Sequence, residues 1–381
     1  MGKTRNTNVS AWQVFCGFAS YYKNYLHIFI LDLVCALVVA GVDIAFPQLL
    51  RFFTNDFFRR SALEIMQALL PIAAGLFAMY LVRTLCQYYI VRWGHIMGTY
   101  MEADMRRDLF SQYQRLSFSY YDKNNSGEML SRIVTDLFDI SELAHHGPEN
   151  ILICSIKIIG SFVCLGLINW RLTAIMLGVT VVMVVLSVIL NYRRRTVFRE
   201  NRERMAGMNS QLQDSLGGIK TVKSFGNESH ELNKFDNINE YFVDTKKRSY
   251  IFLAQFQSLS SAFTGILYMI TVVFGGFCVA NGTMQVADLA IFAIYIGVFI
   301  APIELLINFT ETFQKGYAGF RRFMEIMALR PDVKQKDDAV DMPDDASSKI
   351  VFSDVCFAYE DKQNKINSSK KALTELSKDP D

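Results

Sequence analysis

Long apolar runs alternate with polar stretches along most of this chain of 381 residues. A helix of about 20 apolar residues crosses the ~30 Å of hydrocarbon in a bilayer, so runs of this length predict membrane spans. The chain has six such runs, at about residues 26–50, 62–92, 148–168, 172–190, 250–279 and 286–308. Pro47 predicts a break near the end of the first run. The pattern therefore predicts an all-α membrane protein.

Aromatic residues mark the segment before the first span. Over residues 11–26 they recur at intervals of three and four residues, as Trp12, Phe15, Phe18, Tyr22 and Tyr25. Such a stripe suits an interfacial helix that lies along the membrane surface. An extension of the first span is the alternative that the spacing leaves open.

Helical periodicity continues beyond the spans into charged sequence, at about residues 93–116, 191–215 and 310–328. The second span with its continuation would form a helix of ~50 residues, which is ~75 Å long at 1.5 Å per residue. More than half of that helix would stand in water, because the hydrocarbon is only ~30 Å thick. The turns at the other ends of the spans are short, as at residues 169–171 and 280–283.

Basic residues distinguish the two sides of the membrane. The short turns and the first loop hold Arg51, Arg59, Arg60 and Arg171. The helical extensions hold many more: Arg106, Arg107, Arg115, Lys123, Arg132, Arg193, Arg194, Arg195, Arg199, Arg202, Arg204, Lys246, Lys247 and Arg248. Because basic residues concentrate on the cytoplasmic side, the extensions and both termini are expected to be cytoplasmic. The predicted location is the cell membrane, with several passes.

Composition agrees with this class of protein. Hydrophobic residues make up 51% of the chain, which is high for a soluble domain. The net charge of +2 gives no reason to expect nucleic acid as a partner. The seven cysteines form no CxxC pair and lie mostly in apolar runs, so we expect neither a disulfide framework nor a metal site.

One polar segment stands out between the second and third spans. Residues 117–136 read SFSYYDKNNSGEMLSRIVTD, and the Asn, Ser and Gly residues in the middle favour a turn. Apolar residues then return at helical spacing, at Leu130, Ile133, Val134 and Leu137. The pattern predicts a short exposed element between two long helices. By spacing alone, an ordinary helix–loop–helix corner is the alternative.

This segment resembles the first intracellular coupling segment of ABC exporters, and residues 216–228, LGGIKTVKSFGNE, resemble the second. With the six spans, the resemblance covers nearly the whole chain. It implies that a short helix in each segment contacts a nucleotide-binding domain and passes its movement to the spans. The residues to which it assigns this role are Tyr120, Tyr121, Asp122, Ser126, Gly127, Glu128, Lys223, Ser224, Phe225 and Gly226.

The resemblance also defines the expected domains. Residues 1–328 would form a six-transmembrane-helix ABC exporter domain with long cytoplasmic helical extensions, and residues 329–348 an acidic linker. Residues 349–359 alternate like a strand, and 349–381 resemble the start of a truncated nucleotide-binding domain, a short β segment. In that family the aromatic residue at the position of Tyr359 stacks on adenine.

The family's cofactors are ATP and magnesium, held by a GxxxxGK[ST] loop whose backbone amides and lysine bind the phosphates. No such loop, magnesium-binding aspartate strand or signature helix occurs in these 381 residues. We therefore assign no catalytic residue. We expect that the chain neither binds ATP tightly nor hydrolyses it alone, since phosphate contacts supply the catalysis.

Several charged residues lie within the predicted spans, where an unpaired charge is costly. Asp43, Lys157 and Glu304 lie deepest and are the candidates for a translocation cavity, with structural pairing as the alternative. Asp43 and Lys157 are expected to share a polar pocket. The others lie near span ends, where they are expected to be solvated or to snorkel: Asp32, Arg83, Asp288 and Glu311.

The resemblance implies the membrane-spanning half of an ATP-driven exporter that moves a hydrophobic or amphipathic substrate out of the cytoplasm. Its partners would be the lipid bilayer, a second half-transporter, identical or different, and a nucleotide-binding domain on another chain or missing. A non-enzymatic permease partner, a regulatory subunit and an inactive fragment remain alternatives. A secondary transporter is disfavoured by the long cytoplasmic helices. The sequence does not choose among substrates.

Overall fold

The computed structural model describes residues 11–331, 338–340 and 350–355. The chain divides into two compact units, residues 1–332 and 333–381. In the second unit, residues 350–355 do not form the strand expected over 349–359. A strand is stable only when a neighbour accepts and donates its backbone hydrogen bonds, and the described part of this unit offers none. Tyr359 and most of the expected linker lie outside the described residues.

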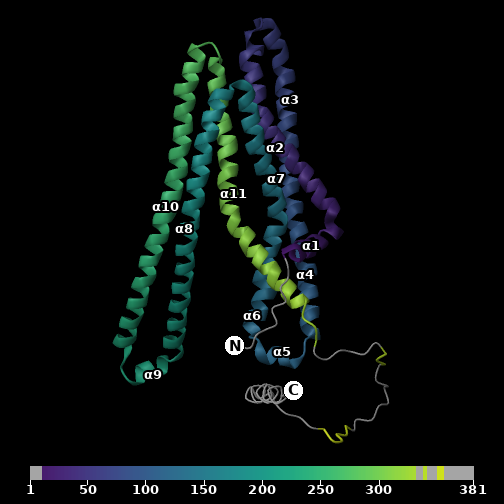
Figure 1. The fold of residues 1–381 in the computed structure, drawn as a ribbon, viewed down its shortest axis with the longest axis vertical. Helices are drawn as coiled ribbons and strands as arrows, with labels where there is room; N and C mark the ends of the chain where they lie inside the picture. The colour runs from purple at the N-terminus through teal and green to yellow at the C-terminus, as the bar shows by residue number, and fades with distance from the viewer. Residues whose placement is uncertain (1–10, 332–337, 341–349, 356–381) are drawn as a thin grey trace, which may run out of the picture. The chain divides into compact units, whose positions relative to one another are not determined.

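The described part of the first unit is helical throughout (Figure 1). Six of its helical stretches are long and apolar enough to cross a membrane, as the sequence predicted. The α-helices are α1 (Ala11–Tyr21), α2 (Leu26–Asn55), α3 (Ala62–Tyr89), α4 (His95–Arg115), α5 (Phe118–Lys123), α6 (Ser126–Ser131), α7 (Leu137–Ile168), α8 (Trp170–Gly217), α9 (Ile219–Ser224), α10 (Glu228–Ala280) and α11 (Val286–Met327). Two short 3₁₀ segments, η1 (Lys23–Tyr25) and η2 (Phe57–Arg59), flank α2. This arrangement confirms the six-span, all-α class.

Polar side chains start the helices that follow the short turns. Asn169, in extended conformation, accepts a hydrogen bond from the backbone N–H of Leu172 at 3.1 Å, and it is the single residue between α7 and α8. Gln285 and Asp288 form a reciprocal capping box at the start of α11. Each cap satisfies an N–H that has no partner inside the helix. The chain can therefore reverse within a few residues.

Helix α11 forms the centre of the main core, through side chains that are fully buried. These include Phe292, Tyr295, Ile296 and Phe299. They pack against buried residues of the neighbouring helices, among them Leu165 of α7, Met176 of α8 and Leu267 of α10. Lipid tails are as apolar as these side chains, so close packing rather than the hydrophobic effect holds this part together.

A second core holds the helices beyond the predicted spans. It joins α4, α7 and α11 through Leu109, Leu137, Phe320 and Phe323, all nearly or fully buried. Here the surroundings are water, so burying each large side chain contributes about 1.5–3 kcal/mol. Gly316 lets α11 approach α7 closely, because a Cβ at this position would lie 2.8 Å from the carbonyl oxygen of Asp139.

Helices α8 and α10 form a long hairpin closed by α9 (Figure 1). At 48 and 53 residues they would be ~72 and ~80 Å long, more than twice the hydrocarbon thickness. The buried residues of α8 end at Asn191, and those of α10 begin at Thr245. Between these positions, the side chains towards α9 are exposed or half-buried. The far part of the hairpin thus buries no side chain within this unit, and its contacts with α11 are polar ones, such as Arg202 with Glu311 at 3.2 Å.

Two local features differ from the sequence prediction. Pro47 does not break the first span, since α2 continues through it to Asn55. A proline removes one backbone hydrogen bond, and the tertiary contacts of α2 maintain the helix across that gap. The expected helix from 62 to about 116 is present as one helical stretch, Ala62–Arg115, but it contains an unpredicted π-helical turn, η3 (Ile90–Gly94). A second π turn, η4 (Arg132–Asp136), precedes α7. Hydrophobic periodicity does not reveal such turns.

Candidate functional site

The first coupling segment forms two short helices, α5 and α6, between α4 and α7. The Asn125 side chain begins α6, because its Oδ1 accepts the backbone N–H of Gly127 at 2.8 Å. The Tyr121 hydroxyl donates a hydrogen bond to the carbonyl oxygen of Tyr113, which attaches α5 to the end of α4. Burial raises the pKa of Tyr120, so this phenol stays neutral beside its neighbours. The segment is thus a fixed corner rather than a loose loop.

The two helices expose apolar side chains. Phe118 is 89% exposed and Leu130 is 63% exposed. Of the residues assigned by resemblance, Asp122 and Glu128 are also exposed, and Glu128 forms an ion pair with Arg132. Large exposed apolar residues ringed by charges are typical of protein-binding surfaces.

The second coupling segment forms α9, at the tip of the α8–α10 hairpin. Gly226 has a φ of +62°, a conformation that suits glycine and turns the chain into α10. Beside it, Phe225 is 78% exposed, and the Ser224 hydroxyl donates to the carbonyl oxygen of Lys220 at 2.8 Å. Figure 1 shows α5, α6 and α9 at the same end of the first unit. The ten assigned residues therefore form two groups, at the ends of different helix pairs.

An ion pair links the first segment to α11. Both guanidinium contacts of Arg322 with the carboxylate of Asp136 measure 2.7 Å. The hydrogen bonds that Arg322 donates to the Asp136 carboxylate raise the pKa of Arg322, so its guanidinium group stays protonated. Asp136 ends η4, the turn that connects α6 to α7. A displacement of α6 would therefore be transmitted to α7 and α11 together.

Within the spans, Asp43 of α2 holds two cations. Its Oδ2 lies 2.6 Å from Nζ of Lys157, and its Oδ1 accepts a hydrogen bond from Nε of Arg83 at 2.7 Å. The structure thus joins Asp43 and Lys157, as expected. It corrects the expectation that Arg83 is solvated, because α3 lies against α2 and brings the guanidinium to the same carboxylate. A cavity of about 320 Å³ lies beside Asp43 and Lys157.

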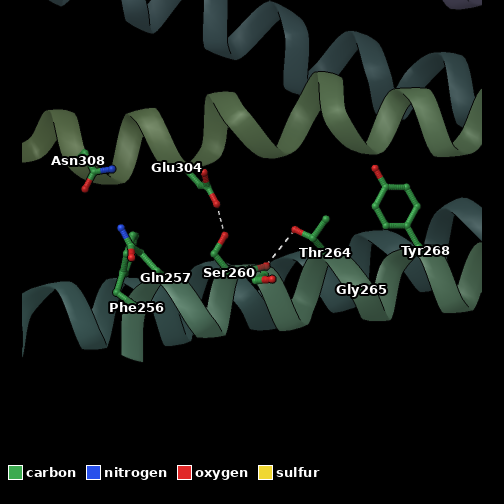
Figure 2. Close-up of a pocket in the computed structure, with 9 residues that line it drawn as sticks. Phe256, Gln257, Ser260, Thr264, Gly265, Tyr268, Glu304 and Asn308 are labelled. Atoms are coloured by element: carbon green, nitrogen blue, oxygen red, sulfur yellow. Dashed lines mark hydrogen bonds between the residues drawn. The ribbon is translucent and has the colours of Figure 1, made fainter. Parts of the chain in front are cut away.

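Glu304 lies apart from that cluster. It faces a cavity of about 560 Å³ between α10 and α11 (Figure 2). The Ser260 hydroxyl donates to its carboxylate, and the lining combines the polar Gln257, Thr264 and Asn308 with the aromatic Phe256 and Tyr268. The three deep charged residues therefore belong to two separate polar sites.

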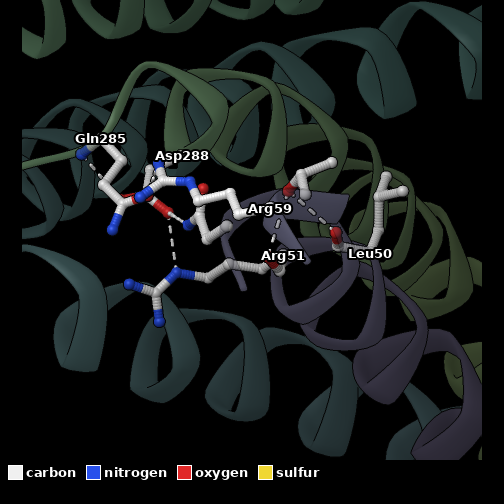
Figure 3. A network of polar contacts seen from close by, with 7 residues as sticks. Leu50, Arg51, Arg59, Gln285 and Asp288 are labelled. Atoms are coloured by element: carbon white, nitrogen blue, oxygen red, sulfur yellow. Dashed lines mark hydrogen bonds and ion pairs between the residues drawn. The ribbon is translucent and has the colours of Figure 1, made fainter. Parts of the chain in front are cut away.

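Asp288 is buried rather than solvated, which corrects the sequence expectation. Arg51 and Asn55 donate to its Oδ1 at 2.7 and 2.9 Å, and Arg59 donates to Gln285 at 2.9 Å (Figure 3). The network fastens the end of α2 to the start of α11. Asp32 is buried as well, although it lies near a span end. The position of a residue along a span predicts its depth in the membrane, but it does not predict which residue of a neighbouring helix it contacts.

Comparisons with known proteins agree with this architecture. Residues 29–303 match the family model of the ABC transporter transmembrane region. The chain is 30% identical to the uncharacterized ABC transporter ATP-binding protein YwjA of Bacillus subtilis, over 92% of this chain and 60% of that protein. It is 26% identical to an ATP-dependent lipid A-core flippase of Syntrophus aciditrophicus, over 87% of this chain and 55% of that protein.

A further relative is the putative multidrug export ATP-binding/permease protein YgaD of Bacillus subtilis, 25% identical over 91% of this chain and 60% of that protein. The chain thus spans about three fifths of the length of these curated relatives. With six apolar helices and the matched region covering most of the spans, the chain belongs to the ABC transporter transmembrane family and is a multi-pass membrane domain of the exporter type.

Proposed function

We propose that this chain forms the membrane-spanning half of an ATP-driven exporter that moves a hydrophobic or amphipathic substrate out of the cytoplasm. One observation carries the proposal: the exposed apolar residues Phe118 of α5 and Phe225, directly after α9, lie at the ends of helices far longer than a bilayer is thick. Such ends suit attachment to a water-soluble domain that does the ATP chemistry.

ATP and magnesium would bind that nucleotide-binding domain, not the described helices. On ATP binding, movement would reach α7 and α11 through α6 and the Asp136–Arg322 pair. The basic residues of the extensions support a cytoplasmic position for α5, α6, α9 and both termini.

The proposal includes a second half-transporter, identical or different. The far part of the α8–α10 hairpin supports it, because no described side chain of α8 beyond Asn191 is buried within the unit. A second copy, or a related half, would cover that part.

The cavity between α10 and α11 supports an amphipathic substrate. Its lining combines the Glu304 carboxylate and the amides of Gln257 and Asn308 with the rings of Phe256 and Tyr268. Relatives carry the names of a lipid A-core flippase and a putative multidrug export protein, and a lipid has polar and apolar parts.

The test is transport by a chimera in which residues 1–348 precede the nucleotide-binding part of the Bacillus subtilis relative YwjA. Inverted vesicles that contain the chimera should accumulate an amphipathic fluorescent cation only with ATP and magnesium. The matched control replaces the phosphate-loop lysine of the added domain. Equal accumulation in the control, or no accumulation of any amphipathic dye or fluorescent lipid, would contradict the proposal and favour a non-transporting role.

A further inference from the structure

Three histidines from two helices meet where the second and third spans pass into their extensions. His95 begins α4, and His145 and His146 lie on α7. Their ring centroids are 4.4 Å apart for His95 and His145, 5.1 Å for His95 and His146, and 4.1 Å for His145 and His146. One ring nitrogen from each of the three lies within 4.8 Å of the others.

Hydrogen bonding fixes two of these rings in the form that binds metals. Nδ1 of His95 lies 2.7 Å from the carbonyl oxygen of Val91, and Nδ1 of His145 lies 2.7 Å from that of Ser141. A carbonyl oxygen only accepts, so each Nδ1 carries the hydrogen and each Nε2 keeps its lone pair. Histidines that bind metals are usually held in this way through the other ring nitrogen.

The Nε2 atom of His145 has no hydrogen-bond partner, although the residue is only 3% exposed. A buried polar atom without a partner is costly, and native structures contain few of them. The nearest carboxylate oxygen, Oε1 of Glu142, is 4.0 Å away. An ion held among the three rings, whose ligand nitrogens lie within 4.8 Å of one another, would satisfy this atom.

Acidic side chains surround the three rings. Glu142 lies 3.9 Å from Nε2 of His146, and Glu149 lies 3.8 Å from its Nδ1. Asp32 of α2 also acts on His146 electrostatically, and its Oδ1 has no hydrogen-bond partner. The negative charge of these carboxylates therefore favours the binding of a cation beside the histidine rings.

We propose that His95, His145 and His146 bind a divalent transition-metal ion of the zinc class, with Glu142 or Glu149 available as a further ligand. Imidazole nitrogen suits zinc, copper and nickel, and three such donors with one open or carboxylate position match common zinc sites. Zinc–nitrogen bonds of ~2.0–2.1 Å in tetrahedral geometry place ligand nitrogens ~3.3–3.4 Å apart, so binding would draw the three rings together by roughly 1–1.5 Å.

The backbone supports this placement. The π turn η3 directly precedes His95 and shifts the register of the helix at that point. Such turns often occur at functional sites. The bound ion would connect α4 to α7 and restrict their relative movement. This inference does not depend on the proposed transport function.

The test uses the full chain, purified in detergent without a polyhistidine tag and stripped with EDTA. We expect Zn²⁺ titration to show one saturable site per chain, and Zn²⁺ to raise the melting temperature. The His95→Gln variant should bind Zn²⁺ at least ~10-fold more weakly, as lost ligand-shell contacts typically do. His95 is exposed, so this variant keeps the packing of the core and its helicity should match wild type.

The chain supplies its own matched control, because its other two histidines, His27 and His230, are exposed and lie outside the cluster. The His27→Gln/His230→Gln variant should retain affinity within about twofold. Absence of a saturable site would overturn the proposal. So would unchanged binding by His95→Gln, equal loss in the control variant, or loss of binding after alkylation of the cysteines.

Discussion

The ammonium group of Lys157 lies 2.6 Å from Oδ2 of Asp43, between α7 and α2 within the predicted spans. The same carboxylate also accepts two hydrogen bonds from Arg83, at 2.7 and 3.2 Å. One carboxylate therefore pairs with two cations from neighbouring helices, and the cluster keeps one excess positive charge. Because one carboxylate serves two cations, the effect of a substitution on stability depends on which of the three residues is replaced.

Asp43→Asn should destabilise the protein more than Lys157→Met does. Removing Asp43 leaves two partly buried cations without an anion, which should lower the free energy of unfolding by on the order of 2–3 kcal/mol. This loss is smaller than the ~3–5 kcal/mol for breaking a fully buried pair. Removing Lys157 leaves the Asp43–Arg83 pair intact. Thermal unfolding in detergent measures both effects.

The double variant Asp43→Asn/Lys157→Met should remain destabilised, because Arg83 still lacks its partner. Adding Arg83→Gln should recover part of the loss. Equal costs for the two single variants, or full recovery in the double variant, would show that Arg83 contributes nothing to the cluster.

Arg322→Gln should loosen the first coupling segment. The substitution removes two charge-assisted hydrogen bonds to Asp136, which are worth about 1.5–3 kcal/mol each at most. We expect a lower melting temperature and faster proteolysis within residues 117–131. The neighbouring Arg321 is the matched control, since among the described residues it pairs with the partly exposed Glu325 one helical turn away. If Arg321→Gln has the same effect, the Asp136–Arg322 pair does not hold the segment.

Single cysteines in a cysteine-free background test the topology. Gly226 and Gly282 are unsuitable positions because both have positive φ. The exposed residues Asp122, Asn227 and Asn281 serve instead. An impermeant thiol reagent on intact cells should label Asn281→Cys and spare Asp122→Cys and Asn227→Cys. The reverse labelling would place the extensions outside and contradict the proposal.

The 381-residue chain itself should show no magnesium-dependent ATPase activity. Its sequence contains no GxxxxGK[ST] loop to hold the phosphates. The measurement is phosphate release from chain purified from a host that lacks other ABC exporters, compared with a mock purification. Activity above the mock level that follows the chain through purification would refute the expectation.

The spans and the turn within residues 117–136 could be predicted because each depends on local sequence. Apolar runs set the membrane helices, and Asn, Ser and Gly set the turn at 124–127. Contacts between distant residues could not be predicted. Arg83 and Asp43 are 40 positions apart, and Arg322 and Asp136 are 186 apart. Their pairing depends on which helix faces which, and a single sequence does not contain that information.

The histidine cluster shows the same limit. His95 is 50 positions from His145, and its approach depends on the π turn η3, which has no clear signal in hydrophobic periodicity. The absence of CxxC pairs therefore did not exclude a metal site. The strand expected at 349–359 does not form over residues 350–355, the part of it that the structure describes. The local alternation was present in the sequence, but alternation alone does not supply the neighbouring strands that a stable sheet requires.

Photo-cross-linking tests most directly whether α5–α6 and α9 contact a nucleotide-binding domain. In the chimera, a benzoylphenylalanine would replace Phe118, Phe225 or, as a control, Phe58 of η2, which is 50% exposed. A protease site within residues 333–348 would then separate the membrane domain from the nucleotide-binding domain. We predict that irradiation joins the two fragments from positions 118 and 225 and not from 58. No adduct from either coupling position, or equal yields from all three, would contradict the account.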